Sequence, residues 1–244
     1  MEKEIRLDKY LADMGKGTRS QLKEAARKGR IHVNGEVVKK ADMKVKVPGD
    51  TVTFDGVPVS YVTMEYYMLN KPQGVVSATE DNRYQTVVDL IDEKNRKDLF
   101  PVGRLDIDTE GLLIITNDGP LAHRLLAPKK HVDKVYFAVC DGHVADSAIS
   151  EFAEGIQLPD GLKCLPAKLE ILKKTLREEK PVTEVHLTIR EGKFHQVKRM
   201  MEAVGCPVLF LKRLTMGPIA LDPDLKTGEY RPLTEKELEM LNQL

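Results

Sequence analysis

The segment PVGRLDIDTEGLLIITNDG contains the side chains best suited to chemistry. Arg104, Asp106 and Asp108 lie in a polar loop directly before the apolar run 112–115, and loops beside rigid strands can display reactive groups. On an extended chain both aspartates could share a face, but the turn residues 109–111 argue against a sustained strand. We therefore expect one aspartate to face a cleft and the other to make local turn hydrogen bonds. The two carboxylates could act as acid and base in a hydrolase, although turn and capping roles are common for loop aspartates.

A second set of polar side chains recurs at helical spacing in the segment FHQVKRMMEAVG. One face carries side chains at positions i, i+3, i+4 and i+7: His195, Lys198, Arg199 and Glu202. The other face carries apolar side chains that can pack inward: Val197, Met201 and Val204. From the spacing alone, Lys198 is an ordinary surface lysine of an amphipathic helix.

Metal and disulfide chemistry have little support. The six histidines lack HExxH or other ligand spacing, so we expect no catalytic metal. Cys140, Cys164 and Cys206 are odd in number, widely spaced and form no CxxC pair, which argues against a disulfide framework and a zinc site. We expect them to be buried and reduced, and nothing in the sequence implies a cofactor.

The elements that must position the polar residues fall into two groups, and the first lies near the N-terminus. Leu7, Leu11 and Met14 recur at helical spacing, and Thr18 with Gln21 forms a capping box for a second helix that runs to residue 29. The residues RIHV-NG-EVVK predict a hairpin, because Asn-Gly tolerates the positive φ angles of a tight turn. A further strand, TVTF, follows Pro48-Gly49-Asp50.

The remainder of the chain has more strands than helices. Strands are predicted at 65–70, 111–116, 134–140, 167–174, 183–190 and 208–213, and helices at 119–126, 144–154, 195–204 and 235–241. Because the two types rarely alternate one for one, a largely antiparallel sheet flanked by helices fits best. We predict an α+β protein with a small domain at 1–60 and a larger one at 61–244.

Composition and charge exclude some classes of protein. With 41% apolar and 31% charged residues the chain is typical of globular proteins. No apolar run approaches the roughly 18 residues of a membrane span, and the first residues are charged rather than apolar as in a signal peptide. We expect a cytoplasmic monomer. The net charge is zero, but the segment from Lys16 to Lys46 contains ten basic and only three acidic residues. This local excess of positive charge is typical both of a surface that binds a phosphate-rich partner and of a solvated helix face.

The basic N-terminal segment resembles a known RNA-binding family. RLDKYLADMGKGTRSQLKEAARKGRIHVNGEVVKK, followed by VPGDTV, is similar to the S-four RNA-binding module. In that family the second helix and the following hairpin form a basic surface against structured RNA. The resemblance places this surface at Lys16, Arg19, Lys23, Arg27, Lys28, Arg30 and Asn34.

Three later segments resemble the RsuA/RluB-type pseudouridine synthases. LNKPQGVVS resembles the opening motif of the family, GRLDIDTEGLLIITNDG its catalytic motif, and IREGKFHQVKRMMEAVGCPVLFLKRLTMGPIAL its closing motif. The resemblance implies isomerisation of uridine to pseudouridine in structured ribosomal RNA, with base flipping and without a cofactor. HRLLAPKKHVDKVYFAVC and GIQLPDGLKCLPAKLEIL look more like the small-subunit type. A large-subunit enzyme and a non-catalytic ribosome-assembly factor are the alternatives.

The same resemblance assigns roles to single residues. Asp106 corresponds to the essential aspartate, and Lys198 is the candidate cation that keeps it ionised. Tyr136 corresponds to an active-site tyrosine that can stack on the displaced uracil or assist proton removal, although core packing is the ordinary role of such a residue. Arg104 corresponds to an arginine that fills the space of the flipped nucleotide or holds a phosphate. Lys71, with the proline that follows it, is expected to shape the cleft.

Overall fold

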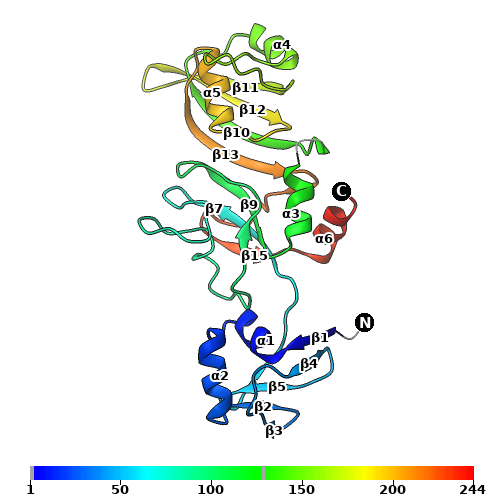
Figure 1. Ribbon diagram of the computed structural model, residues 1–244. Helices are drawn as coiled ribbons and strands as arrows, with labels where there is room; N and C mark the ends of the chain where they lie inside the picture. The colour runs from blue at the N-terminus through cyan, green and yellow to red at the C-terminus, as the bar shows by residue number, and fades with distance from the viewer. Residues whose placement is uncertain (1–2, 128–129) are drawn as a thin grey trace. The chain divides into compact units, whose positions relative to one another are not determined.

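The computed structural model describes residues 3–127 and 130–244, which fold into two compact units (Figure 1). The first unit comprises the residues up to Glu65 together with the separate segment Asp92–Leu99. The second comprises Tyr66–Ile91 and Phe100–Leu244. The chain therefore passes between the units three times. Among the described residues, no helix combines the length and the apolar character that crossing a membrane requires.

The first unit combines two helices with short strands. The helices are α1 (Leu7–Asp13) and α2 (Arg19–Arg27). An antiparallel sheet has the order β3-β2-β5-β6, with β2 at Ile31–Val33, β3 at Glu36–Val37, β5 at Val52–Phe54 and β6 at Val57–Val59. A separate pair joins β1 (Lys3–Arg6) to β4 (Lys44–Val47). The predicted helices, hairpin and TVTF strand are confirmed, whereas β1, β4 and β6 were not predicted.

Local sequence explains the ends of these elements. The Thr18 side chain accepts a hydrogen bond from the Gln21 backbone, and the Gln21 side chain accepts one from the Thr18 backbone, so the predicted capping box is present. The hairpin turn places Asn34 at φ 52° and Gly35 at φ 84°, as a type I′ turn requires. Leu11, Leu22 and Ile31 are fully buried in the core of the unit.

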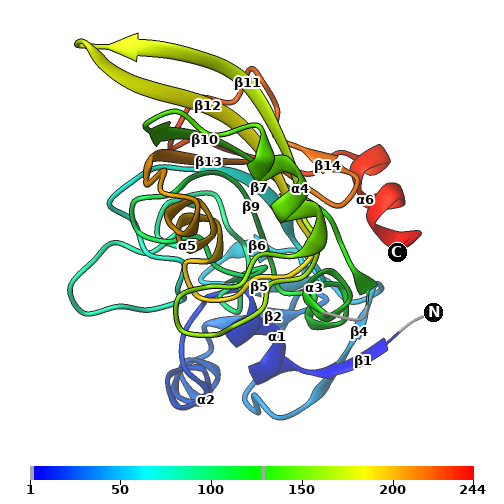
Figure 2. The same cartoon turned by 90° about the horizontal axis from the view of Figure 1, so that it is seen from above.

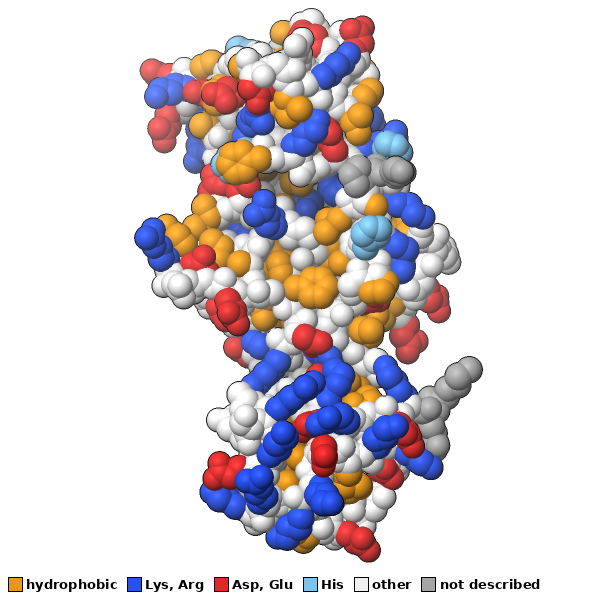
Figure 3. All heavy atoms as spheres, viewed as in Figure 1, with side chains coloured by type: hydrophobic (Ala, Val, Ile, Leu, Met, Phe, Trp, Pro, Cys, Tyr) orange, Lys and Arg blue, Asp and Glu red, His pale blue; other side chains and the backbone are white. Residues whose placement is uncertain are grey.

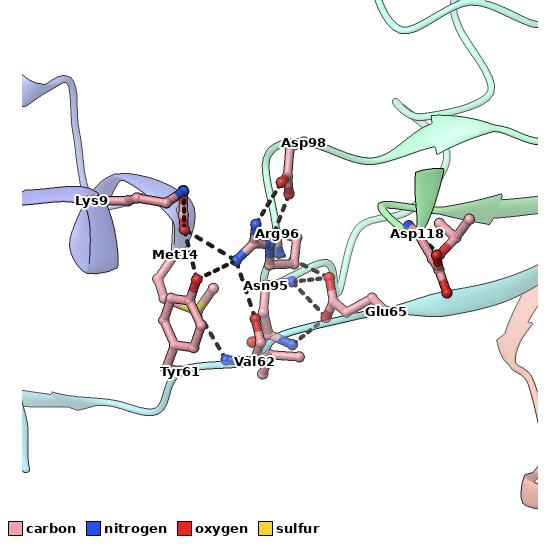
Figure 4. Close-up of polar contacts among 11 residues, drawn as sticks. Lys9, Met14, Tyr61, Val62, Glu65, Asn95, Arg96, Asp98 and Asp118 are labelled. Carbon is pink, nitrogen blue, oxygen red and sulfur yellow. Dashed lines mark hydrogen bonds and ion pairs between the residues drawn. The ribbon is translucent and has the colours of Figure 1, made fainter. Parts of the chain in front are cut away.

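A buried arginine holds Asp92–Leu99 within the first unit (Figure 4). Arg96 is 5% exposed and donates to the Tyr61 hydroxyl at 3.2 Å and to the Val62 carbonyl at 3.3 Å. Its guanidinium also pairs with Asp98 at 2.5 Å and with Asp13 at 3.4 Å. Each nitrogen of the Arg96 guanidinium has a charged or polar partner. These interactions compensate for its removal from water.

The second unit is built on a nine-stranded sheet. Its main order is β11-β12-β10-β13-β9-β7-β15, with β8 paired to β9 and β14 paired to β13. The strands are β7 (Tyr66–Lys71), β8 (Phe100–Pro101), β9 (Glu110–Thr116), β10 (Lys134–Asp141), β11 (Lys168–Arg177), β12 (Lys180–Ile189), β13 (Val208–Met216), β14 (Ile219–Ala220) and β15 (Tyr230–Pro232). Every pairing is antiparallel except that of β13 with β9. Figure 2 shows the long β11–β12 hairpin at one edge.

Among the described residues, four α-helices accompany this sheet: α3 (Gly119–Leu126), α4 (Ser147–Glu154), α5 (Gln196–Ala203) and α6 (Glu235–Asn242). Leu121 and Leu125 of α3 and Leu241 of α6 share a core with Leu112 and Ile114 of β9. The α+β architecture, the six longer strands and the four helices are confirmed. The prediction for α4 began too early, because the Val144 amide donates to the Thr183 hydroxyl and the helix starts at Ser147.

Candidate active site

The loop that carries Arg104, Asp106 and Asp108 is fixed at its C-terminal end by a close backbone contact. There Gly111 of β9 pairs with Arg213 of β13 in the one parallel register of the sheet. Gly111 has φ 103°, and a Cβ on it would lie 2.7 Å from the Arg213 amide nitrogen and closer still to the Arg213 carbonyl oxygen. Only glycine fits this position without a shift of β13.

A buried lysine fixes the same loop from β7. Lys71 is 0% exposed, and its ammonium donates at 3.0 Å to the carbonyl oxygens of Pro72, Asp106 and Thr109. Burial lowers the pKa of Lys71 from 10.5 to about 8, against the opposing influence of Asp106 and Asp108. Lys71 therefore acts on the backbone of the loop, which agrees with the expectation that it shapes the cleft. The sequence did not reveal that it holds the carbonyl of Asp106 itself.

Asp106 lies in a pocket beside a cation. The pocket is lined by Arg104, Leu105, Asp106, Thr109, Tyr136, Ile189, Gly192, Lys193, His195, Gln196, Val197, Lys198 and Leu211. Asp106 Oδ2 is 3.2 Å from Lys198 Nζ, and their side chains are 29% and 24% exposed. The ammonium of Lys198 therefore lies within ion-pair distance of the Asp106 carboxylate at the pocket.

Asp108 shares the same lysine. Its Oδ1 accepts a hydrogen bond of 2.5 Å from Lys198 Nζ, and its side chain is 61% exposed. Asp108 therefore has a partner on α5 in addition to a local backbone hydrogen bond at Asp108 itself. Partial burial alone would raise the pKa of Asp108, but the hydrogen bond and the charge of Lys198, together with a backbone hydrogen bond and the nearby His195, hold that pKa below its usual value.

Tyr136 and Arg104 occupy different parts of the pocket. Tyr136 lies on β10 and is 7% exposed, and it belongs to the pocket wall with the apolar Ile189 and Leu211. An aromatic face within an apolar wall suits stacking with a flat ring. Arg104 is exposed and also lines the pocket, and within 3–127 and 130–244 no carboxylate forms a salt bridge with it. Its guanidinium is therefore available to an anion.

Helix α5 differs from the predicted helix at its N-terminal end. His195 is not its first residue but precedes it in the left-handed conformation, with φ 48° and ψ 33°. His195 Nε2 lies 3.6 Å from Asp106 Oδ1, so the imidazole adjoins the carboxylate. Val197 and Met201 pack inward as predicted. Arg199 forms an ion pair with Asp160 rather than with the pocket aspartates.

The predicted RNA-contacting residues of the first unit are unequally available. Arg30 pairs with both carboxylate oxygens of Asp55 and lies over the Phe54 ring, and Lys28 pairs with Glu24. The Asn34 side chain binds Asp50 and Thr51. The others form an exposed row in and before α2: Lys16, Arg19, Lys23 and Arg27. Lysine and arginine side chains cover much of this unit on the face shown in Figure 3.

No metal site is evident in the part of the chain that the structure describes, where no group of three or more His, Cys, Asp or Glu side chains could hold an ion. Cys140, Cys164 and Cys206 are buried free thiols, as predicted. Burial raises the pKa of Cys140 to about 12, so this thiol stays protonated at neutral pH.

Comparisons with known proteins identify the family of the chain. Residues 65–203 match the model of the RNA pseudouridylate synthase family, and residues 5–52 match the S4 domain. An uncharacterized RNA pseudouridine synthase of Bacillus subtilis is 51% identical over 98% of this chain and 99% of its own length. The ribosomal small subunit pseudouridine synthase A of Escherichia coli is 42% identical over 96% of this chain and 98% of its own.

A solved structure extends the likeness to the fold. A pseudouridylate synthase crystal structure with 39% sequence identity superimposes with a TM-score of 0.67, covering 97% of this chain and 99% of that one. The matched family region contains the loop of Asp106, the strand of Tyr136 and the helix of Lys198. The chain belongs to the RNA pseudouridylate synthase family and carries an N-terminal S4 domain.

Proposed function

We propose that this RNA pseudouridine synthase isomerises a uridine of small-subunit ribosomal RNA, with Asp106 as the catalytic carboxylate. The observation that carries the proposal is the pocket in which Asp106 pairs with Lys198 at 3.2 Å and shares a lining with Tyr136. The small-subunit assignment is supported by the 42% identity to the Escherichia coli enzyme named for that substrate.

The reaction breaks the bond between C1′ of the ribose and N1 of uracil and forms a bond between C1′ and C5. The uracil rotates between the two steps, N1 gains a proton and C5 loses one, so no atom is gained or lost overall. Positive character develops at the sugar during cleavage, and a carboxylate stabilises it by charge or by covalent attack, as in glycosidases. Asp106 takes this role because it lies in the pocket, with the ammonium of Lys198 3.2 Å from its carboxylate.

The other pocket residues act on the uracil and on the RNA backbone. The Tyr136 ring stacks on the displaced uracil, and its hydroxyl assists removal of the C5 proton. The target nucleotide must leave its stack to enter the pocket, which costs a few kcal/mol and is easiest in a loop or an unpaired region. Arg104, exposed at the pocket, fills the vacated space or holds a phosphate.

The first unit supplies affinity for structured RNA. Its row of Lys16, Arg19, Lys23 and Arg27 is exposed and gives positive charge, and none of the four forms a salt bridge among the described residues. Contacts of this kind neutralise phosphates and contribute binding energy that does not depend on sequence. Recognition of the target uridine is then left to the pocket and its surroundings.

Replacement of Asp106 tests the chemical role. Asp106→Asn preserves the size of the side chain but removes its charge, so we expect RNA binding within about twofold of wild type and no detectable pseudouridine. Asp108→Asn, the same change in the same loop, is the matched control and retains measurable turnover. The measurement is pseudouridine mapping after incubation with purified ribosomal RNA. Appreciable turnover by Asp106→Asn removes Asp106 from the mechanism.

The substrate assignment needs a separate assay. Purified small- and large-subunit RNAs are incubated with the protein, and the modified position is mapped in each. We expect one uridine of the small-subunit RNA to be converted. Modification of the large-subunit RNA alone would overturn the subunit assignment. Loss of the gene without loss of any ribosomal pseudouridine would favour a binding-only role instead.

A further inference from the structure

Phe194 and His195 form an exposed aromatic pair next to the Asp106 pocket. Their ring centroids are 3.7 Å apart and their planes differ by 20°, so the rings are stacked. Phe194 is 70% exposed. The imidazole covers one face of the Phe194 ring, and most of the remaining side-chain surface is exposed.

The imidazole connects this pair to the reacting carboxylate. His195 lines the pocket, and its Nε2 lies 3.6 Å from Asp106 Oδ1. Phe194 therefore stacks directly on a side chain that adjoins Asp106. A flat group that stacks on Phe194 would extend the stack of the His195 and Phe194 rings by one more ring.

The backbone at His195 is held in an uncommon conformation. His195 has φ 48° and ψ 33°, in the left-handed region that non-glycine residues rarely occupy. Residues held in such conformations cluster at ligand-binding and active sites. The Gln196 side chain helps to hold the turn, since its Oε1 accepts from the Lys193 amide at 2.9 Å and its Nε2 donates to Glu191 at 2.6 Å. The aromatic pair is thus presented by a rigid turn.

Other exposed apolar side chains lack this combination of features. Leu176 is 69% exposed but lies near the tip of the β11–β12 hairpin, and Tyr84 is 51% exposed outside the pocket lining. Phe194 alone among these three is stacked on a residue that lines the pocket. An exposed aromatic ring with one covered face suits a nucleobase, because every base has a flat face that stacks on aromatic rings.

We infer that Phe194, backed by His195, stacks on an unpaired nucleobase adjacent to the everted target uridine. This inference rests on the proposed RNA substrate at the Asp106 pocket and adds a residue that helps to choose the site. Stacking holds the flanking nucleotide while the uridine is displaced, so unpaired neighbours are favoured over helical ones. Phe194 is then a positioning and specificity-determining residue, whereas Asp106 carries the chemistry.

Kinetic measurement on RNA with single abasic sites tests the inference. We expect Phe194→Ala to lower kcat/KM on intact RNA by about 5- to 100-fold, mainly through KM, from the usual contribution of base–aromatic stacking. Phe194→Tyr retains most activity, and Leu176→Ala, with matched exposure, is unchanged. When one flanking base is deleted, wild type and Phe194→Ala become equal. A loss below twofold, or an equal loss on every RNA, overturns the inference.

A binding measurement separates this inference from the proposed function. The probe is a single-stranded oligoribonucleotide with 2-aminopurine next to a uridine, whose fluorescence falls when the base stacks. We expect wild type to quench the probe and Phe194→Ala to quench it several-fold less, with Leu176→Ala as control. Equal quenching by wild type and Phe194→Ala rejects the stacking role even if the enzyme is active. Normal quenching without pseudouridine formation on any ribosomal RNA rejects the proposed function and leaves the stacking contact in place.

Discussion

Lys198 donates a 2.5 Å hydrogen bond to Asp108, although these residues are 90 positions apart in the chain. The same ammonium lies 3.2 Å from Asp106, so one cation serves two carboxylates. A lysine can do this because its ammonium is a compact charge with three rotatable donors. The loop of Asp106 and the helix of Lys198 are thereby tied together at the pocket.

Removal of the lysine charge should therefore affect both carboxylates. We expect Lys198→Met to lower the rate of pseudouridine formation by 100-fold or more, because two carboxylates would be left without their shared cation. Lys198→Arg keeps the charge and should retain more than a tenth of the activity. Single-turnover rates on the same RNA measure both effects. Equal activity of Lys198→Met and wild type would show that Asp106 does not depend on this cation.

Asp108 has a smaller role than Asp106, and its replacement should distinguish the two. Its side chain is 61% exposed, against 29% for Asp106. Asp108→Asn leaves Lys198 paired with Asp106 alone, so we expect a loss of about 3- to 10-fold in the single-turnover rate, with affinity for RNA unchanged. A loss as large as that of Asp106→Asn would assign the chemistry to both aspartates.

Lys71 of β7 holds the Asp106 loop through hydrogen bonds to its carbonyl oxygens. Replacement of Lys71 should therefore lower both stability and activity. Lys71→Met leaves the carbonyls of Pro72, Asp106 and Thr109 without their donor, and unsatisfied buried acceptors are costly. We expect the free energy of unfolding to fall by about 1–3 kcal/mol, measured by chemical denaturation at pH 7, and the single-turnover rate to fall as well. Unchanged activity with reduced stability would limit Lys71 to a structural role.

The low pKa of Lys71 also predicts opposite trends of activity and stability with pH. Folding lowers this pKa from 10.5 to about 8, so between these values the unfolded lysine holds a proton that the folded lysine has lost. The contribution of Lys71 to stability therefore rises as the pH increases from about 8 to 10.5. Activity should fall above about pH 8, because a neutral amine has fewer donors for the loop. The free energy of unfolding and the activity are measured against pH for wild type and Lys71→Met. Curves that run parallel for the two proteins would contradict the prediction.

Gly111 gives a prediction about the backbone contact that fixes the loop. Gly111→Ala places a Cβ against the backbone of Arg213 at a residue with φ 103°, so we expect a loss of about 3 kcal/mol in the free energy of unfolding. Gly119→Ala is the matched control, because a Cβ there meets nothing within 4 Å, and we expect a change within about 0.5 kcal/mol. Thermal unfolding of the two variants makes the comparison. Similar melting temperatures would contradict the close contact.

Local sequence predicted the elements whose signals are local. The turn at Asn34 and Gly35 and the capping box at Thr18 each depend on a few neighbouring residues, and the structure confirms them. The pairing of β1 with β4 joins Lys3–Arg6 to Lys44–Val47, and neither four-residue segment has a pattern that reveals so distant a partner. Short strands of this kind become visible only when the fold brings them together.

The sequence predicted which residues lie at the candidate site but not all of the contacts that position them. Resemblance identified Asp106, Tyr136 and Lys198 as site residues, and the structure places all three at one pocket, although their chemical roles remain predictions. The hydrogen bonds of Lys71 to the loop carbonyls depend on backbone positions 35 and 38 residues away. The left-handed conformation of His195 likewise has no signal in the residue type. Both features follow from tertiary packing rather than from a motif.

The basic row of the first unit leads to a prediction about salt dependence. Lys23 and Arg27 are exposed on α2 at a spacing of four residues, on one face of the helix. If each contacts a phosphate, Lys23→Ala and Arg27→Ala should each weaken RNA binding and reduce the slope of log K against log salt by about 0.7–0.9. Lys236→Ala, an exposed lysine of α6, is the control and should leave the slope unchanged. Filter-binding titrations at several salt concentrations measure the slopes. Equal slopes for all four proteins would mean that neither Lys23 nor Arg27 contacts a phosphate, and RNA affinity would then have to come from other residues.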